Sequence, residues 1–304
     1  MTATKTLAGA IFASILLISC NSPQRAETWP AKIGEVNPAS PEIVETSTPR
    51  SNPENWEAAP VIPTELSERA RQIYASGQEM GRDPNVFSKV GDCGGMPSWF
   101  LGPFDDESDD YRLGKYQYLS DVIDYFQGSF GRASLAVRDG FNAAAILSPV
   151  RASHEACKEG EDPLACEYRV SNPSIALIML GTNDVYHVNQ FERRLRQIIE
   201  YTIEQGTLPV LASKPDNLEG DQSINRIIYA LSVEYEIPFW NVWRELQNLP
   251  DGGLQEDQAH VTFAPNYFDN STVMLSGWPH RNLTALQVLD FLWRELEPPR
   301  QAFD

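Results

Sequence analysis

Apolar residues recur along the chain in two patterns, short continuous runs and longer stripes at helical spacing. The short runs predict strands at 86–90, 134–138, 174–180, 208–212 and 239–242. The stripes predict helices at about 64–77, 119–126, 191–199, 224–231 and 283–296. The third run is almost wholly apolar, as in a parallel strand that is buried on both faces. This alternation predicts an α/β domain in which helices cover both faces of a parallel sheet.

Polar and glycine-containing segments follow three of the predicted strands. Gly91-Asp92-Cys93 follows the first, Asp139-Gly140 the second and Gly181-Thr182-Asn183-Asp184 the third. The carboxyl ends of parallel strands meet at one edge of the sheet, where sites form. A fourth segment, Asp257-Gln258-Ala259-His260, lies further along the chain. We expect the four segments to meet in one site.

These segments hold the residue types that acyl transfer requires. That chemistry needs a nucleophile, a base, an acid that orients the base, and donors for the developing oxyanion. Cys93, His260 and Asp257 supply the first three. The backbone amides of Cys93 and Gly140 and the side chain of Asn183 supply the donors.

The order of the four segments resembles the sequence blocks of the SGNH hydrolases, also called GDSL hydrolases. The resemblance implies a three-layer α/β/α sandwich with a flavodoxin-like parallel sheet. It also implies that Cys93 is the nucleophile, at the position where the family usually has serine. Gly140 and Asn183 match the oxyanion residues of the family, and Asp257 and His260 match its acid and base.

Two alternatives remain open within this interpretation. His280, just before the last predicted helix, is a rival base, although Gly277 stands where the acid partner of the family pattern belongs. Cys93 is either a thiolate whose pKa is lowered by a histidine and a helix N-terminus, or an inert thiol in a protein that has lost activity. The segment after His260 also differs from the family, because a loop precedes the last helix.

The predicted function is a cell-envelope hydrolase of the SGNH type that cleaves an ester through an acyl-enzyme on Cys93. The substrate class is a small-molecule, glycan or lipid ester, with a carbohydrate acetyl group among the options. An O-acyltransferase would use the same residues, and a non-catalytic surface lipoprotein would keep the pocket for binding. The sequence has no metal-ligand spacing and no Gly-rich phosphate loop, so we expect no cofactor and no metal.

The first 20 residues of the sequence carry processing signals, and a tether is predicted to follow them. Lys5 precedes an apolar run that ends in Leu17-Ile18-Ser19-Cys20, which resembles a bacterial lipobox. The resemblance implies a lipoprotein signal peptide at 1–19 and a lipid anchor on Cys20 that holds an exported protein on a membrane. An ordinary signal peptide or an uncleaved anchor are the alternatives. Residues 20–63, rich in Pro, Ser and Thr, predict a tether, and 64–304 a single domain.

Charge and cysteine usage agree with an exported protein. The formal net charge of −18 argues against a nucleic-acid partner, because binding phosphates needs a basic face. Cys157 and Cys166 lie in a loop-like stretch and are predicted to form a disulfide in an oxidising compartment. With Cys20 assigned to lipid, Cys93 is left unpaired.

Overall fold

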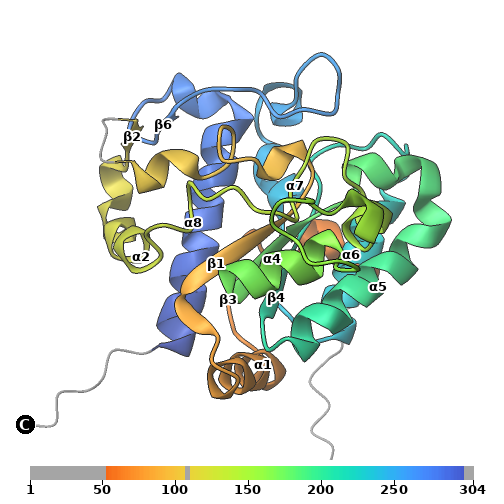
Figure 1. Ribbon diagram of the computed structural model, residues 1–304. Coiled ribbons are helices and arrows are strands. Elements are labelled where there is room, and N and C mark those ends of the chain that lie inside the picture. Colours follow the sequence, from red (N-terminus) through yellow and green to blue (C-terminus); the bar gives the residue numbers. More distant parts are fainter. Residues whose placement is uncertain (1–52, 107–109, 298–304) are drawn as a thin grey trace, which may run out of the picture. The chain divides into compact units, whose positions relative to one another are not determined.

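The computed structural model of the chain describes residues 53–106 and 110–297 (Figure 1). The predicted signal peptide at 1–19, Cys20 and the predicted tether as far as residue 52 therefore lie outside the described residues. Among the described residues, no helix has the length and apolar character that crossing a bilayer requires. Residues 53–106 and 110–297 belong to one compact unit by their contacts.

A parallel sheet forms the centre of the described unit. Its strands are β1 (Asp83–Gly91), β3 (Pro173–Met179), β4 (Leu208–Ala212) and β5 (Phe239–Trp240). They lie in the order β1-β3-β4-β5, and each neighbouring pair is parallel. Every residue of β3 is buried, as its apolar run predicted. A separate small parallel sheet pairs β2 (Tyr111–Arg112) with β6 (Asn266–Tyr267).

The second predicted strand, 134–138, is reduced to a single bridge. Val137 pairs with Gly91 in the parallel direction, on the side of β1 away from β3. The Ser134 hydroxyl donates to the Lys89 carbonyl at 2.6 Å and accepts from the Ala136 amide at 3.1 Å. A side chain thus makes contacts that backbone groups make in a regular ladder. With the Val137 bridge at the edge beside β1, the sheet order is Val137, β1, β3, β4, β5. Counted in the five predicted strands, this is the flavodoxin-like order 2-1-3-4-5.

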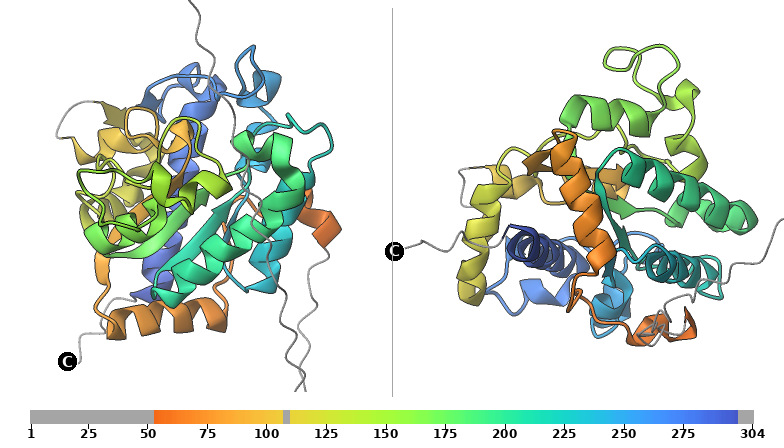
Figure 2. Two further views of the ribbon diagram at one scale, coloured as in Figure 1. Left: turned by 45° about the vertical axis from the view of Figure 1, so that its right-hand side comes forward. Right: turned by 90° about the horizontal axis from the view of Figure 1, so that it is seen from below.

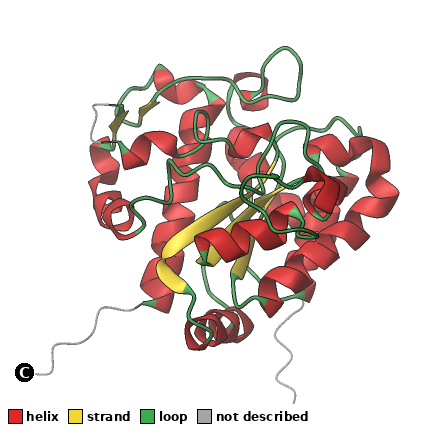
Figure 3. Cartoon of the chain, in the orientation of Figure 1, coloured by secondary structure: helices red, strands yellow, loops and turns green. Residues whose placement is uncertain are grey.

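Helices cover both faces of the sheet. They are α1 (Glu68–Glu79), α2 (Ser120–Tyr125), α3 (Ala143–Ile146), α4 (Pro163–Ser171), α5 (Val188–Glu204), α6 (Ser223–Glu234), α7 (Val242–Leu246) and α8 (Gly277–Leu296). In Figures 1 and 2, α4 and α5 lie on one face, and α8 passes behind the other. Figure 3 shows the yellow strands between these two layers. The predicted α/β/α architecture is confirmed.

Short 3₁₀ helices connect these elements. They are η1 (Pro53–Ala58), η2 (Cys93–Gly95), η3 (Gly102–Asp105), η4 (Gly114–Leu119), η5 (Pro149–Arg151), η6 (Thr182–His187), η7 (Pro250–Gly253) and η8 (Val273–Leu275). Two of them, η2 and η6, directly follow β1 and β3. They hold the polar segments that the sequence placed at the ends of these strands.

Two predicted helix starts were wrong. The first helix is capped by Ser67, whose hydroxyl accepts from the Ala70 amide at 2.9 Å, and not by Thr64. The last helix begins at Gly277 and not near residue 283. Pro279 falls in its first turn, where a missing N–H costs no intrahelical hydrogen bond.

Residues 53–63 pack on the domain, although the sequence assigned them to the tether. The Trp56 side chain is 1% exposed, and its ring centroid lies 4.7 Å from that of Trp243. The Asn241 amide donates to the carbonyls of Trp56 at 2.9 Å and Ala59 at 3.1 Å. These residues therefore belong to the folded unit, in contrast to the predicted boundary at residue 64.

Candidate active site

The segment that carries Cys93 leaves β1 in a tight turn. Gly91 lies so close to β3 that an added Cβ would be 2.4 Å from the Met179 carbonyl oxygen, so only glycine fits there. The next residue, Asp92, caps η2 by accepting from the Gly94 amide at 2.9 Å. Cys93 is the first residue of this turn and is partly exposed. The turn holds its thiol at the carboxyl end of the sheet.

His260 and Asp257 lie beside this thiol. The Cys93 Sγ is 3.8 Å from Nε2 of His260, and Nδ1 of His260 is 2.6 Å from Oδ2 of Asp257. A carboxylate only accepts, so Nδ1 carries the hydrogen and Nε2 is left to accept a proton from the thiol. The three side chains have the relative positions of nucleophile, base and orienting acid.

A short turn fixes the carboxylate of Asp257. The amides of Ala259 and His260 both donate to its Oδ1 at 3.0 Å. Hydrogen bonds from the His260 amide and ring, together with the Ala259 amide, lower the pKa of Asp257 to about 2. The Gln255 amide closes the turn by donating to the His260 carbonyl at 2.8 Å. Asp257 is therefore ionised at neutral pH.

The thiol of Cys93 is not a preformed thiolate. Burial raises its pKa, and the nearby carboxylates of Asp92 and Asp139 raise it further. The Arg281 guanidinium and the Gly94 amide oppose this rise without cancelling it. Of the two alternatives that the sequence left open, the thiolate with a lowered pKa therefore does not hold, and the Cys93 thiol keeps its proton at neutral pH.

The predicted oxyanion residues come from the turns after the other two predicted strands. Gly140 has a φ of 72°, which favours glycine. The Asn183 side chain donates to the Phe141 carbonyl at 3.0 Å, which uses one of its two N–H groups. The buried Asp184 accepts from the Ala143 amide at 3.1 Å, and burial raises its pKa to about 6. Both side chains hold the Gly140 turn against η6.

One cavity of about 420 Å³ joins these groups. Its lining includes Cys93, Gly140, Asn183 and His260, which come from all four sequence segments. Asp257 stands behind His260 and does not line the cavity. The structure thus brings together the residues that the sequence singled out.

His280, the rival base, does not face this cavity. Its Nδ1 lies 2.6 Å from the Glu245 carboxylate and its Nε2 lies 2.8 Å from the Met274 carbonyl. Both partners are acceptors, so both ring nitrogens donate and the ring is an imidazolium. Burial lowers the pKa of His280, but the hydrogen bonds to Glu245 and Met274 outweigh it and the pKa is raised. His280 joins α7 to α8.

The loop after His260 returns to its starting point before α8 begins. The Gly277 amide donates to the Thr262 hydroxyl at 2.8 Å, and the Trp278 amide donates to the Thr262 carbonyl at 3.1 Å. The Thr262 amide in turn donates to Gly253 at 2.8 Å. The helix therefore starts close to the Asp257–His260 turn, although many residues intervene between them in the sequence.

Sequence reasoning missed two cations that line the cavity. Lys214, after β4, forms ion pairs with Asp216 and Glu219, both at 2.5 Å, and the Thr182 hydroxyl donates to Asp216 at 2.7 Å. This cluster joins the loops after β3 and β4. Arg281 lies in the first turns of α8, which the sequence did not assign to the helix.

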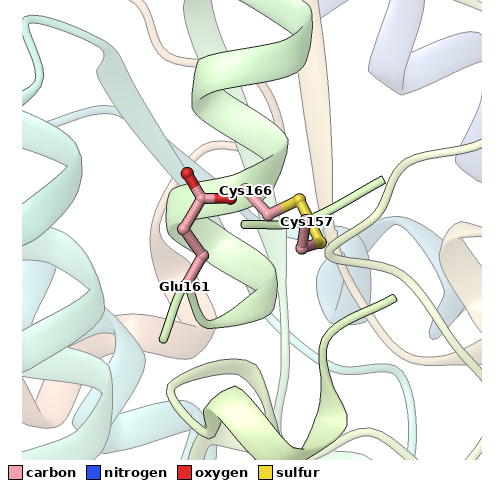
Figure 4. Close-up of side chains that lie close together, drawn as sticks. All are labelled: Cys157, Glu161 and Cys166. Carbon is pink, nitrogen blue, oxygen red and sulfur yellow. A yellow bond between two sulfur atoms is a disulfide. The ribbon is translucent and has the colours of Figure 1, made fainter. Parts of the chain in front are cut away.

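Away from the cavity, Cys157 and Cys166 form a disulfide with an S–S distance of 2.10 Å. Figure 4 shows this bond with the Glu161 carboxylate beside it. One possible metal-ligand atom of each of these three side chains lies within 4.8 Å of the others. Because both sulfurs are bonded to each other, neither is a thiolate that would bind a metal. The disulfide connects α4 to the loop that precedes it.

Comparison with known proteins gives matches only among solved structures. No protein-family model and no curated protein matches the chain. A GDSL-like lipase from Bacteroides thetaiotaomicron VPI-5482 is 14% identical with a TM-score of 0.42, covering 74% of this chain and 99% of that one. The acetylxylan esterase Axe2 from Geobacillus stearothermophilus is 15% identical with a TM-score of 0.43, covering 70% and 96%. The esterase EstA from Pseudoalteromonas sp. is 14% identical with a TM-score of 0.42, covering 69% and 99%.

Proposed function

We propose that this protein is an ester hydrolase of the SGNH type that works through an acyl-enzyme on Cys93. The observation that carries the proposal is the line of contacts from Cys93 Sγ to His260 Nε2 at 3.8 Å and from His260 Nδ1 to Asp257 at 2.6 Å. Oxyanion donors from Gly140 and Asn183 line the same cavity. A binding protein without catalysis would have no need for this alignment.

The first half of the reaction forms a thioester. Because the raised pKa keeps the Cys93 thiol protonated, His260 Nε2 takes the proton as sulfur attacks the carbonyl carbon of the ester. Asp257 stabilises the imidazolium that forms. The tetrahedral oxyanion accepts hydrogen bonds from the Cys93 and Gly140 amides and the free N–H of Asn183. The carbon–oxygen bond then breaks, and His260 gives its proton to the leaving alcohol.

The second half releases the acid. Water attacks the thioester carbonyl while His260 accepts a proton from the water, and the same donors hold the oxyanion. The carbon–sulfur bond breaks, and the proton on His260 returns to the sulfur. No cofactor enters either half-reaction.

The cavity suits a short acyl group. Its volume of about 420 Å³ is at the small end of the range for ligand sites. Trp278 lines it, and the exposed Trp99 stacks on Trp278 with ring centroids 6.4 Å apart. Aromatic rings at the edge of a site can pack against a sugar. We therefore favour a small acyl ester, with a carbohydrate acetyl ester as the leading case.

Turnover of p-nitrophenyl acetate by wild type, Cys93→Ala and Cys93→Ser tests the nucleophile. We expect Cys93→Ala to lose turnover with the fold intact by circular dichroism. Cys93→Ser should lose rate, because the 3.8 Å spacing to His260 fits a sulfur atom and is long for a hydroxyl. Turnover by Cys93→Ala equal to wild type would overturn the proposal.

We also propose that the protein is exported and held on a membrane of the cell envelope by a lipid on Cys20. The lipobox-like sequence ending at Cys20 supports this proposal. Fractionation of cells that express wild type or Cys20→Ala tests it. We expect wild type in the membrane fraction and Cys20→Ala released from it. An unmodified Cys20 thiol in the mature protein, detected by mass spectrometry, would contradict the anchor.

A further inference from the structure

Arg281 is a buried cation in the catalytic cavity. Arg281 is 7% exposed and lines the same cavity as Cys93 and His260. The guanidinium carbon lies over the rings of Phe100 and Trp278, 5.0 Å from each centroid. Two aromatic rings therefore pack against the guanidinium and offset part of the cost of its burial.

The N–H groups of this guanidinium have almost no acceptors within the described residues. Nη2 lies 3.2 Å from the Met179 sulfur, which is a weak acceptor, and Nε is buried without a partner. The Asp92 carboxyl group opposes the lowering of the Arg281 pKa by burial, yet the two side chains form no ion pair. Lys214, the other buried cation of the cavity, is compensated by Asp216 and Glu219.

The guanidinium also touches the turn that carries the nucleophile. A Cβ added to Gly94 would lie 2.9 Å from Nη1 of Arg281, so the cation occupies the space of the missing side chain. An anion that contacts Arg281 is therefore close to Cys93. Arg281 lowers the pKa of Cys93, whereas the carboxylates of Asp92 and Asp139 raise it. These carboxylates repel an anion, so an anionic ligand is favoured where it contacts the guanidinium.

We propose that Arg281 is an anion-binding group of the catalytic cavity, and that the cavity takes esters that carry a carboxylate close to the reacting carbonyl. This inference rests on the proposed function for its substrate class. A planar guanidinium matches a carboxylate, which accepts two parallel hydrogen bonds. Such a ligand also compensates a buried charge whose desolvation is otherwise poorly repaid.

Alkylation of Cys93 tests the inference without any ester. Iodoacetate and iodoacetamide transfer a similar two-carbon group to the thiolate, with formation of a carbon–sulfur bond and loss of iodide. They differ in charge, since only iodoacetate has a carboxylate. Rates are measured on the full chain from the mass of the Cys93 peptide, which separates this thiol from other cysteines. N-acetylcysteine provides the ratio for a free thiol.

We expect the iodoacetate-to-iodoacetamide rate ratio of wild type to exceed that of N-acetylcysteine. Arg281→Met should lower this ratio about tenfold or more, because it removes a charged hydrogen-bond donor. Methionine suits the apolar surroundings of Phe100, Trp278 and Met179. Arg112→Met is the matched control: it loses the same charge from an arginine that stacks on Tyr267, at 4.1 Å, and does not line the cavity. Its ratio should equal that of wild type.

Two results would overturn the anion site. One is an unchanged ratio in Arg281→Met, and the other is an equal slowing of both reagents, which would mean that Arg281 acts on the thiolate alone. If Arg281→Met does not fold, protection of wild type decides: succinate should slow the reaction with iodoacetamide, and no protection refutes the site. A wild type that prefers iodoacetate but cleaves no ester would refute only the hydrolase.

Discussion

Two histidines of this protein each pair one ring nitrogen with a carboxylate, but the second ring nitrogen has a different kind of partner in each. His260 and His280 each place Nδ1 2.6 Å from a carboxylate oxygen, of Asp257 and Glu245 respectively. The Nε2 of His260 faces the Cys93 thiol, whereas the Nε2 of His280 donates to the Met274 carbonyl. The His260 side chain is 59% exposed and the His280 side chain is 18% exposed.

The comparison shows that a histidine–carboxylate pair does not by itself identify a catalytic base. A base needs a nitrogen without a hydrogen, and only His260 has one within reach of an acidic proton. His280 has two acceptors as partners, so it is held as a cation and serves packing. The second nitrogen therefore separates a catalytic histidine from a structural one.

Replacing the two histidines one at a time gives the largest expected difference. His260→Ala should lower kcat/KM for p-nitrophenyl acetate by about 10²–10⁴-fold, because the thiol loses its general base. His280→Gln should retain near wild-type turnover per folded molecule, with folding checked by circular dichroism. A comparable loss in both variants would contradict the assignment of His260.

Removing an oxyanion donor tests whether His260 alone accounts for the activity, since a correctly placed base is not sufficient for acyl transfer. Asn183→Ala keeps the His260–Cys93 contact and removes a donor, so we expect a loss of about 10²–10³-fold in kcat. Single-turnover kinetics with the same ester locate the loss in acyl transfer. Retention of full turnover would mean that Asn183 only supports the Phe141 carbonyl.

Replacing His280 should lower the stability of the fold more than replacing His260, which is the reverse of their expected effects on turnover. His280→Leu removes two hydrogen bonds at a mostly buried site, and we expect it to lower the free energy of unfolding by about 1–3 kcal/mol. His260→Leu, at an exposed site, should change it by less than about 0.5 kcal/mol. Urea unfolding followed by tryptophan fluorescence measures both. Equal effects would break the comparison.

The smallest expected effect is on the pH dependence of stability. The pKa of His280 is raised above its usual 6.5 in the folded protein, so its contribution is complete below pH 6.5 and is lost as pH rises through the folded value. The stability difference between wild type and His280→Leu should therefore shrink on the alkaline side. A difference that stays constant, measured as Tm from pH 5 to 9, would argue against the imidazolium.

Much of the site could be predicted because its signals are local. β3 and β4 have continuous apolar runs, and the polar segments that follow Gly91 and Gly181 mark the carboxyl edge of the sheet. The pairing of Asp257 with His260 follows from their short separation in one turn. These features depend on neighbours in sequence, so a single chain reveals them.

The sequence-based predictions were wrong or incomplete where contacts between residues distant in the sequence determine the local structure. The second strand shrinks to a bridge because the Ser134 side chain pairs with Lys89, and alternation of apolar residues does not show this. Residues 53–63 fold because Asn241 and Trp243 provide partners for Trp56. The role of Arg281 depends on aromatic rings from two segments. The choice between His260 and His280 likewise needed their tertiary partners.

The closure of the chain between Thr262 and Gly277 affects how this protein can vary. Because the Thr262 hydroxyl and carbonyl hold the amides of Gly277 and Trp278, the intervening residues leave and return at one point. The stretch between these two positions includes β6 and the buried Phe268, which pack on the domain, so only its exposed parts, 263–265 and 269–272, are external. Insertions there lengthen a loop at the surface without displacing His260 or α8, and the entropy of closing a loop rises only slowly with its length. This stretch also brings Phe263, 61% exposed, within 5.7 Å of Trp99. Related chains could therefore change the surface around the mouth of the cavity by altering loop length while the Asp257–His260 turn stays fixed.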